Sequence, residues 1–170
     1  GDPSLFKLLE NAPNISSLSG LGIDLAEEII ERSASIKAKI VISDEKEGGI
    51  RAILNYGHTF GHVIENLCGY GKYLHGEAVA IGMVAVGELA VLKGKWSVAE
   101  SIRQKELIRK AGLPTDWPDL NIDNVLKTLQ GDKKVQDSKI RFIIPSQIGA
   151  VEICNEIKNE DIKECINRLN

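Results

Sequence analysis

Apolar residues recur at spacings of three and four over most of the chain, which predicts a mainly helical fold. The clearest periodic stretch follows Asp24, which is predicted to cap a long helix, and its apolar positions are Leu25, Ile29, Ile30, Ile36 and Ile40. The acidic segment 43–49 ends in two glycines and is expected to terminate this helix. A later stretch, over 78–87, is apolar almost throughout, which is typical of a buried helix.

Turn and capping residues divide the chain into further elements. Asp2 and Pro3 predict the N-cap and the first residue of a short helix, and the polar residues 11–22 predict a loop. More helices are expected at about 50–67, 75–92, 97–111, 123–130 and 161–169. Only residues 139–145 and 150–153 have the character of short strands around a turn. The sequence therefore predicts a multi-helix bundle with a small β-ribbon near the C-terminus.

Composition and charge narrow the class of protein. A chain of 170 residues with 43% hydrophobic residues suits one compact domain with its own core. The net charge of −3 gives no general attraction to nucleic acid or to an anionic membrane. The run 78–87 is much shorter than a bilayer span, and the first residues lack the features of a signal peptide. The three cysteines form no CxxC pair, so a reduced, cytoplasmic chain is expected.

The sequence contains no clear nucleotide-binding motif. No G-x-G-x-x-G segment follows an expected strand, and the sequence shows neither a P-loop nor alternating strands and helices. The triplet Gly69-Tyr70-Gly71 is by itself a weak signal. If the protein uses a dinucleotide, its main binding site is expected outside this chain.

The strongest chemical signal is the grouping of all three histidines, His58, His62 and His75, in one short window. His58 and His62 are four residues apart, so they lie on one helical face and can chelate a metal. His75 begins the next expected helix, after a glycine-marked turn that can bring it back toward them. A single pair at this spacing is more often a surface or packing feature, and the surrounding residues decide between the two interpretations.

Those neighbours are polar and recur on the same expected face. Arg51 and Asn55 precede His58 and His62 at spacings of three and four, which favours the wall of a polar cavity. Arg51 offers a planar fork of donors for a carboxylate or phosphate, and Lys37 offers a point charge. Together these side chains predict a site for an oxygen-rich, anionic small molecule beside a metal ion. Three further residues fit either this site or a solvated loop, namely Glu47, Lys133 and Lys134.

These residues lie in segments that resemble the dehydroquinate synthase family. The resemblance is carried by Asp44-Glu45-Lys46-Glu47-Gly48-Gly49-Ile50-Arg51, by Leu54-Asn55-Tyr56-Gly57-His58-Thr59-Phe60-Gly61-His62, and by Leu74-His75-Gly76-Glu77 with the apolar residues that follow. It continues through Asp132-Lys133-Lys134-Val135, Arg141-Phe142-Ile143-Ile144-Pro145 and Ile148-Gly149. It covers nearly the whole chain.

The resemblance implies a two-domain enzyme. Its N-terminal α/β domain binds NAD, its C-terminal helical domain binds a divalent metal, Zn²⁺ or Co²⁺, and the substrate, and the two domains enclose the active site. Such an enzyme converts a sugar-acid phosphate, 3-deoxy-arabino-heptulosonate 7-phosphate, to 3-dehydroquinate and phosphate. Residues 1–170 then correspond to the single C-terminal domain, without the NAD-binding domain. We expect this domain to be inactive alone and the complete enzyme to be a cytoplasmic homodimer.

The resemblance also implies roles for individual residues. His58 and His75 correspond to two of three metal ligands, the third being a glutamate of the other domain. His62 corresponds to a residue that transfers protons. The spacing of His58 and His62 suggests a different role for it, that of a metal ligand paired with His58. Glu47 corresponds to a second acid–base residue. The implied substrate-binding residues are Lys37, Arg51, Asn55 and Lys134, the last favoured over Lys133 as the phosphate-binding lysine.

Three other classes are compatible with parts of this pattern. Another sugar-phosphate cyclase, such as a 2-deoxy-scyllo-inosose synthase, would share the metal and NAD chemistry but take a different substrate. A metal-dependent polyol or alcohol dehydrogenase would not need the basic set of Lys37, Arg51 and Lys134. A helical interaction module without activity would expose a large apolar face instead of a polar stripe.

Overall fold

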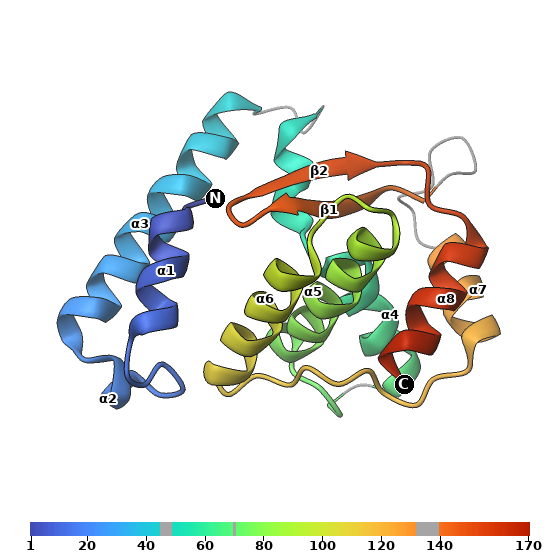
Figure 1. Cartoon of the computed structure of the whole chain (residues 1–170), viewed down its shortest axis with the longest axis horizontal. Helices are drawn as coiled ribbons and strands as arrows, with labels where there is room; N and C mark the ends of the chain where they lie inside the picture. The colour runs from blue at the N-terminus through green and yellow to red at the C-terminus, as the bar shows by residue number, and fades with distance from the viewer. Residues whose placement is uncertain (45–48, 70, 132–139) are drawn as a thin grey trace.

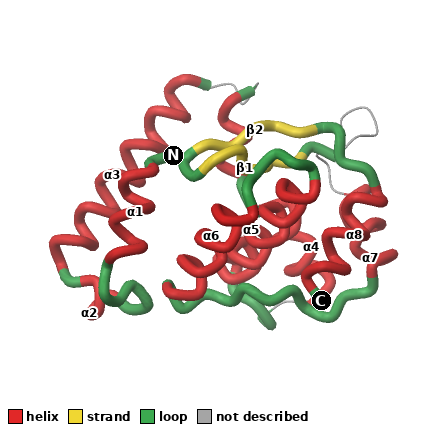
Figure 2. Tube along the Cα trace, viewed as in Figure 1, coloured by secondary structure: helices red, strands yellow, loops and turns green. Residues whose placement is uncertain are grey.

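The computed structural model describes residues 1–44, 49–69, 71–131 and 140–170 (Figure 1). In chain order the elements are α1 (Pro3–Asn11), α2 (Leu18–Leu21), α3 (Ile23–Ser43), the 3-10 helix η1 (Ile50–Asn55), α4 (His58–Cys68), α5 (His75–Leu92), α6 (Val98–Lys110), α7 (Ile122–Gly131), β1 (Phe142–Gln147), β2 (Ala150–Cys154) and α8 (Asn159–Leu169). Figure 2 shows the two strands as a small ribbon among helices. This arrangement confirms the predicted helical bundle with a β-ribbon near the C-terminus.

Helix α5 is the centre of the core. It packs against α4, α6, α8 and β1 (Figure 1), and its apolar residues are buried on several sides. Phe60, Ile81, Leu89 and Phe142 are at most 1% exposed. Within the described residues, α5 is the one helix long and apolar enough to span a membrane, but 61% of it is buried inside the fold. Its composition is therefore explained by its place in the core.

Glycines allow α4 and α5 to approach closely. A Cβ atom at Gly82 would lie 2.1 Å from the carbonyl oxygen of Gly57, and one at Gly61 would lie 3.2 Å from the Cα of Val79. The two helices run in opposite directions, because Gly57 faces Met83 whereas Gly61 faces Val79. This contact fixes the start of α4 against the middle of α5.

The β-ribbon covers one end of this core. Strands β1 and β2 are antiparallel, with Phe142 opposite Cys154 and Ile144 opposite Glu152. Residues 142–145 are buried, and β1 packs against α5 (Figure 1). The strand β1 begins three residues later than predicted, and residue 139 lies outside the described residues.

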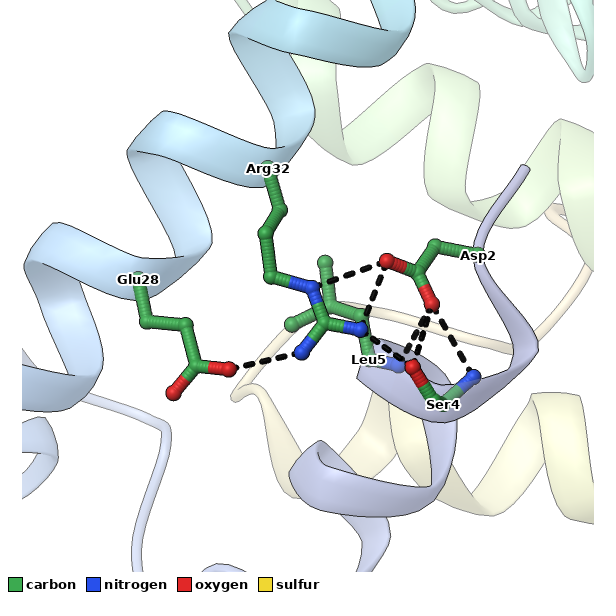
Figure 3. A network of polar contacts seen from close by, with 5 residues as sticks. All are labelled: Asp2, Ser4, Leu5, Glu28 and Arg32. Atoms are coloured by element: carbon green, nitrogen blue, oxygen red, sulfur yellow. Dashed lines mark hydrogen bonds and ion pairs between the residues drawn. The ribbon is translucent and has the colours of Figure 1, made fainter.

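The N-terminal helices α1 to α3 form one edge of the molecule, away from α7 and α8 (Figure 1). Asp2 caps α1 by accepting hydrogen bonds from the backbone of Ser4 and Leu5, as predicted. Figure 3 shows how Asp2 and Ser4 also contact Arg32 of α3, which in turn binds Glu28 at 2.6 Å. The bond from Leu5, followed by those from Arg32 and Ser4, holds the pKa of Asp2 well below its usual range. Polar contacts thus join α1 to α3.

Three local predictions are wrong. The helix expected over about 50–67 is two elements, because Tyr56 and Gly57 form a turn in which Gly57 has a φ of +80°, and this turn interrupts the helix before His58. The expected cap of α3, Asp24, lies in its first turn, and Gly22 is the N-cap instead. The short helix α2 also lies inside the loop predicted for 11–22.

Candidate metal and substrate site

The three histidines converge on one side of the α4–α5 pair. His58 is the first residue of α4, His62 lies one turn later, and His75 is the first residue of α5. Their ring centroids are 5.2 Å apart for His58 and His75, 5.6 Å for His58 and His62, and 6.2 Å for His62 and His75. The antiparallel contact between the helices explains this, because it places the beginning of α5 beside the length of α4.

Two of the rings are oriented by oxygen atoms. The Nδ1 atom of His58 lies 3.2 Å from the backbone oxygen of Tyr56, and the Nδ1 atom of His75 lies 3.0 Å from a carboxylate oxygen of Glu65. A carbonyl or carboxylate oxygen can only accept, so each Nδ1 is assigned the proton. In that tautomer the lone pair lies on Nε2, the atom through which each ring would bind a metal.

These two imidazoles fit part of a catalytic metal site. Neutral imidazole nitrogen suits zinc and cobalt, and catalytic zinc usually has three protein ligands. Among the described residues, no group of three or more His, Cys, Asp or Glu side chains is arranged to hold a metal by itself. His58 and His75 would therefore supply two ligands, and a complete site needs at least one further group.

The orientation of His58 is supported from the core. The hydroxyl group of Tyr56 donates to Gln104 of α6 at 2.5 Å, and the amide of Gln104 donates to the backbone oxygen of Met83 in α5 at 2.9 Å. Burial raises the pKa of the Tyr56 phenol above its usual value, so this donor keeps its proton. The Tyr56 residue, whose carbonyl faces His58, is thus attached to two core helices.

Asp44 fixes the element that carries Arg51 and Asn55. One of its carboxylate oxygens accepts from the backbone N–H of Gly49 at 2.8 Å and of Arg51 at 3.0 Å. Arg51 and Asn55 are both half-buried on η1, which packs against α3. They precede the histidines as predicted, but the break at Gly57 means that they do not share one helical face with them.

The other predicted site residues are placed differently. Lys37 is exposed on α3, which packs against η1, so it belongs to another element than the histidines. Glu47, Lys133 and Lys134 lie outside the described residues. The structure therefore brings the three histidines together and places Arg51 and Asn55 on the element directly before them.

A hollow of about 410 Å³ lies beside His62. It is lined by His62, Val63, Asn66, Thr128 and Gly131, which come from α4 and α7. The sequence did not indicate Thr128 as a neighbour, because it is distant in the chain and belongs to no recognisable motif. The contact of Glu65 with His75 was also not predicted, although the spacing of three from His62 places Glu65 on the same side of α4.

The arrangement of these helices is shared with known synthases. The solved structure of ValA, a 2-epi-5-epi-valiolone synthase from Streptomyces hygroscopicus subsp. jinggangensis 5008 with NAD⁺ and Zn²⁺ bound, matches 99% of this chain and 46% of that protein, with a TM-score of 0.87 and 25% identity. A 2-deoxy-scyllo-inosose synthase complexed with carbaglucose-6-phosphate, NAD⁺ and Co²⁺ has the same fold, with a TM-score of 0.73 and 22% identity over 99% of this chain and 52% of that one. The fold is thus that of a domain found in two synthases whose solved structures contain NAD⁺ and a divalent metal.

The sequence comparisons identify the family within this class. Residues 1–135 match the family model described as 3-dehydroquinate synthase C-terminal, and the chain belongs to this family. It is 62% identical to the 3-dehydroquinate synthase of Prochlorococcus marinus (strain MIT 9303) and 60% identical to that of Synechococcus sp. (strain CC9605). Each match covers 99% of this chain but only 45% and 46% of the relative, respectively.

Proposed function

We propose that this chain is the metal- and substrate-binding domain of a 3-dehydroquinate synthase. The complete enzyme would convert 3-deoxy-arabino-heptulosonate 7-phosphate to 3-dehydroquinate and phosphate in the cytoplasm, as a homodimer. The convergence of His58, His62 and His75 is the structural observation that carries the proposal. The family match and the relatives at 60–62% identity support the choice of reaction.

His58 and His75 would hold the divalent metal through their Nε2 atoms. When bound, a zinc or cobalt ion supplies a positive charge that polarises substrate oxygens. The third ligand would come from the NAD-binding part, which the relatives have room for in the half of their length that this chain does not cover. The nicotinamide would carry the hydride, and this domain would position the substrate against it.

The remaining side chains would bind the substrate and move protons. Arg51 suits the substrate carboxylate or phosphate because its guanidinium donates two parallel hydrogen bonds. Asn55 can bind hydroxyl groups, and Lys37 and Lys134 would add positive charge for the phosphate. His62 and Glu47 would transfer protons, His62 from its position beside the hollow between α4 and α7.

A related cyclase activity is the second candidate. The two cyclase structures have the same fold, but their identity to this chain is 25% and 22%, against 62% for a 3-dehydroquinate synthase. This difference favours the synthase. Carbaglucose-6-phosphate is an analogue of glucose 6-phosphate in which carbon replaces the ring oxygen. Glucose 6-phosphate is therefore the appropriate comparison substrate.

The test is a substrate panel with the complete enzyme, NAD⁺ and Zn²⁺ or Co²⁺. We expect phosphate release from 3-deoxy-arabino-heptulosonate 7-phosphate, with 3-dehydroquinate identified by mass spectrometry, and no release from glucose 6-phosphate. Cyclisation of glucose 6-phosphate in place of the heptulosonate would overturn the proposal in favour of the second candidate. If the enzyme acts on neither substrate, both the proposed reaction and the second candidate are wrong.

A further inference from the structure

The contact between Glu65 and His75 joins two helices at the edge of the site. Glu65 lies in α4 and His75 begins α5, and the side chains meet at 3.0 Å. The Glu65 side chain is 31% exposed and that of His75 is 57% exposed. Even with His75 protonated, an ion pair at this exposure would add at most about 1 kcal/mol to stability. The main effect of Glu65 is therefore on the orientation of the His75 imidazole, because its carboxylate oxygen accepts a hydrogen bond from Nδ1.

A second carboxylate fixes the backbone beneath the same ring. Glu77 accepts a hydrogen bond from the backbone N–H of Leu74 at 2.8 Å and so closes the first turn of α5, where His75 is the first residue. The two acidic residues thus have separate tasks. Glu77 holds the start of the helix, and Glu65 holds the imidazole.

We propose that Glu65 is a positioning residue that orients His75 as a metal ligand and makes its Nε2 atom a stronger donor. The inference rests on the proposed function, because it takes His75 as a ligand of the divalent metal. A histidine ligand commonly donates its other ring N–H to a carboxylate, which fixes the tautomer and raises the basicity of the coordinating nitrogen. Glu65 itself touches neither metal nor substrate.

The test is the affinity of the complete enzyme for Zn²⁺ and Co²⁺, measured by competition with a chromophoric chelator. Loss of such a carboxylate typically weakens metal binding about 10–100-fold, and we expect this for Glu65→Ala. Glu65→Gln should weaken binding less, because its amide oxygen still accepts from Nδ1. The matched control is Glu77→Gln, which removes a charge two residues from His75 but keeps an acceptor for Leu74; its affinity should stay within about twofold.

A second measurement reads the tautomer directly. In ¹⁵N-histidine spectra of the metal-free protein, His75 should carry its proton on Nδ1 in the wild type and become a mixture of tautomers in Glu65→Ala. Wild-type affinity for Zn²⁺ and Co²⁺ from Glu65→Ala, or an equal loss from Glu77→Gln, would overturn the role of Glu65.

The His75→Ala variant separates this inference from the proposed function. If His75→Ala leaves metal binding unchanged, then the proposed metal site fails, whatever Glu65 does. If His75→Ala abolishes binding while Glu65→Ala does not weaken it, then the metal site stands and only the positioning role fails. Circular dichroism of each variant checks that the helices remain.

Discussion

At the scale of single residues, the three histidines differ in their surroundings. His58 faces a backbone carbonyl and His75 faces a carboxylate, which suits ligands whose Nε2 atoms point to a metal. His62 lines the hollow between α4 and α7. This difference favours the assignment of His58 and His75 as ligands and of His62 as a proton-transfer residue.

The first prediction tests that division. In the complete enzyme, His62→Gln should lower kcat by about 10²–10⁴-fold, because positioned proton transfer contributes that much, while the metal content by elemental analysis stays near that of the wild type. His58→Gln should lose the metal. A His62→Gln enzyme without metal would show instead that His58 and His62 form the chelating pair.

The second prediction concerns Arg51, which is half-buried on η1. Arg51→Ala in the complete enzyme should lower kcat/KM by an amount equivalent to about 2–5 kcal/mol, the cost of truncating a buried charge pair. Arg51→Lys should recover only part of this, because lysine cannot donate the planar pair of hydrogen bonds. Arg109→Ala, at an exposed ion pair on α6, is the control and should leave the kinetics unchanged. Unchanged constants in Arg51→Ala would make Arg51 a surface charge.

At the scale of elements, the crossing of α4 and α5 determines the site. The close approach at Gly57, Gly61 and Gly82 places the start of α4 against α5, so that the imidazoles meet. The hydrogen bonds of Tyr56 and Gln104 add α6 to this support. The site thus depends on the packing of three helices.

The third prediction tests this crossing with Gly82→Ala. Alanine is favoured over glycine inside a helix by about 1 kcal/mol, but the new Cβ would lie 2.1 Å from the Gly57 carbonyl, which is backbone. Overpacking of this kind costs about 1–3 kcal/mol, so urea unfolding should show a net loss of stability, together with weaker metal binding. At Gly76 a Cβ would meet no atom within 4 Å, so Gly76→Ala should not destabilise. A Gly82→Ala chain as stable as Gly76→Ala would contradict this account.

The elements differ in how far the sequence determines them. The helices over 75–92 and about 97–111 were predicted, because both depend on local pattern and capping. The break at Tyr56–Gly57 was not, since the turn at Gly57 and its close approach to α5 appear only in the fold. In the same way, the grouping of histidines was visible in the sequence, but the partner of His75 required the fold. Glu47 and Lys134 keep their predicted roles as hypotheses, because they lie outside the described residues.

At the scale of the whole molecule, acidic side chains join parts that are distant in the chain. Glu100 accepts from the backbone N–H of Ile148 at 3.0 Å and from Ser97 at 2.8 Å, which attaches α6 to the turn of the β-ribbon. The bond from Ile148 and then that from Ser97 lower the pKa of Glu100. Burial acts to raise the pKa of Asp161, but hydrogen bonds from the Lys158 backbone and from Lys93 lower it. The pKa of Asp2 is lowered as well.

The fourth prediction follows from the direction of these shifts. A carboxyl group with a lowered folded-state pKa stabilises the fold above its unfolded pKa, about 4, and this stabilisation is lost as the pH falls through the folded-state value. The part of the free energy of unfolding that these carboxyl groups contribute should therefore be lost in urea titrations below about pH 4. Glu100→Gln should make that loss smaller, whereas Glu31→Gln, at an exposed position of α3, should not. If the free energy of unfolding falls equally steeply with pH in the wild type, Glu100→Gln and Glu31→Gln, then Glu100 makes no contribution.

The last prediction compares the 170-residue chain alone with the complete enzyme. The chain would offer His58 and His75 as ligands, and among its described residues no group of three or more His, Cys, Asp or Glu side chains could hold a metal. The histidines should nevertheless stay together without metal, because α4 and α5 pack through residues such as Phe60 and Ile81 that are at most 1% exposed.

Isothermal titration with Zn²⁺ should therefore show weak binding to the chain alone, since catalytic zinc usually needs three protein ligands. The chain should also lack synthase activity, because hydride transfer needs bound NAD. Adding the separately purified NAD-binding domain should strengthen zinc binding and restore some turnover, as the third ligand and the cofactor then come together. Tight zinc binding by the chain alone that survives His75→Ala but not His62→Ala would reverse the ligand assignment. Robust turnover by the chain alone would show that its residues suffice for the reaction.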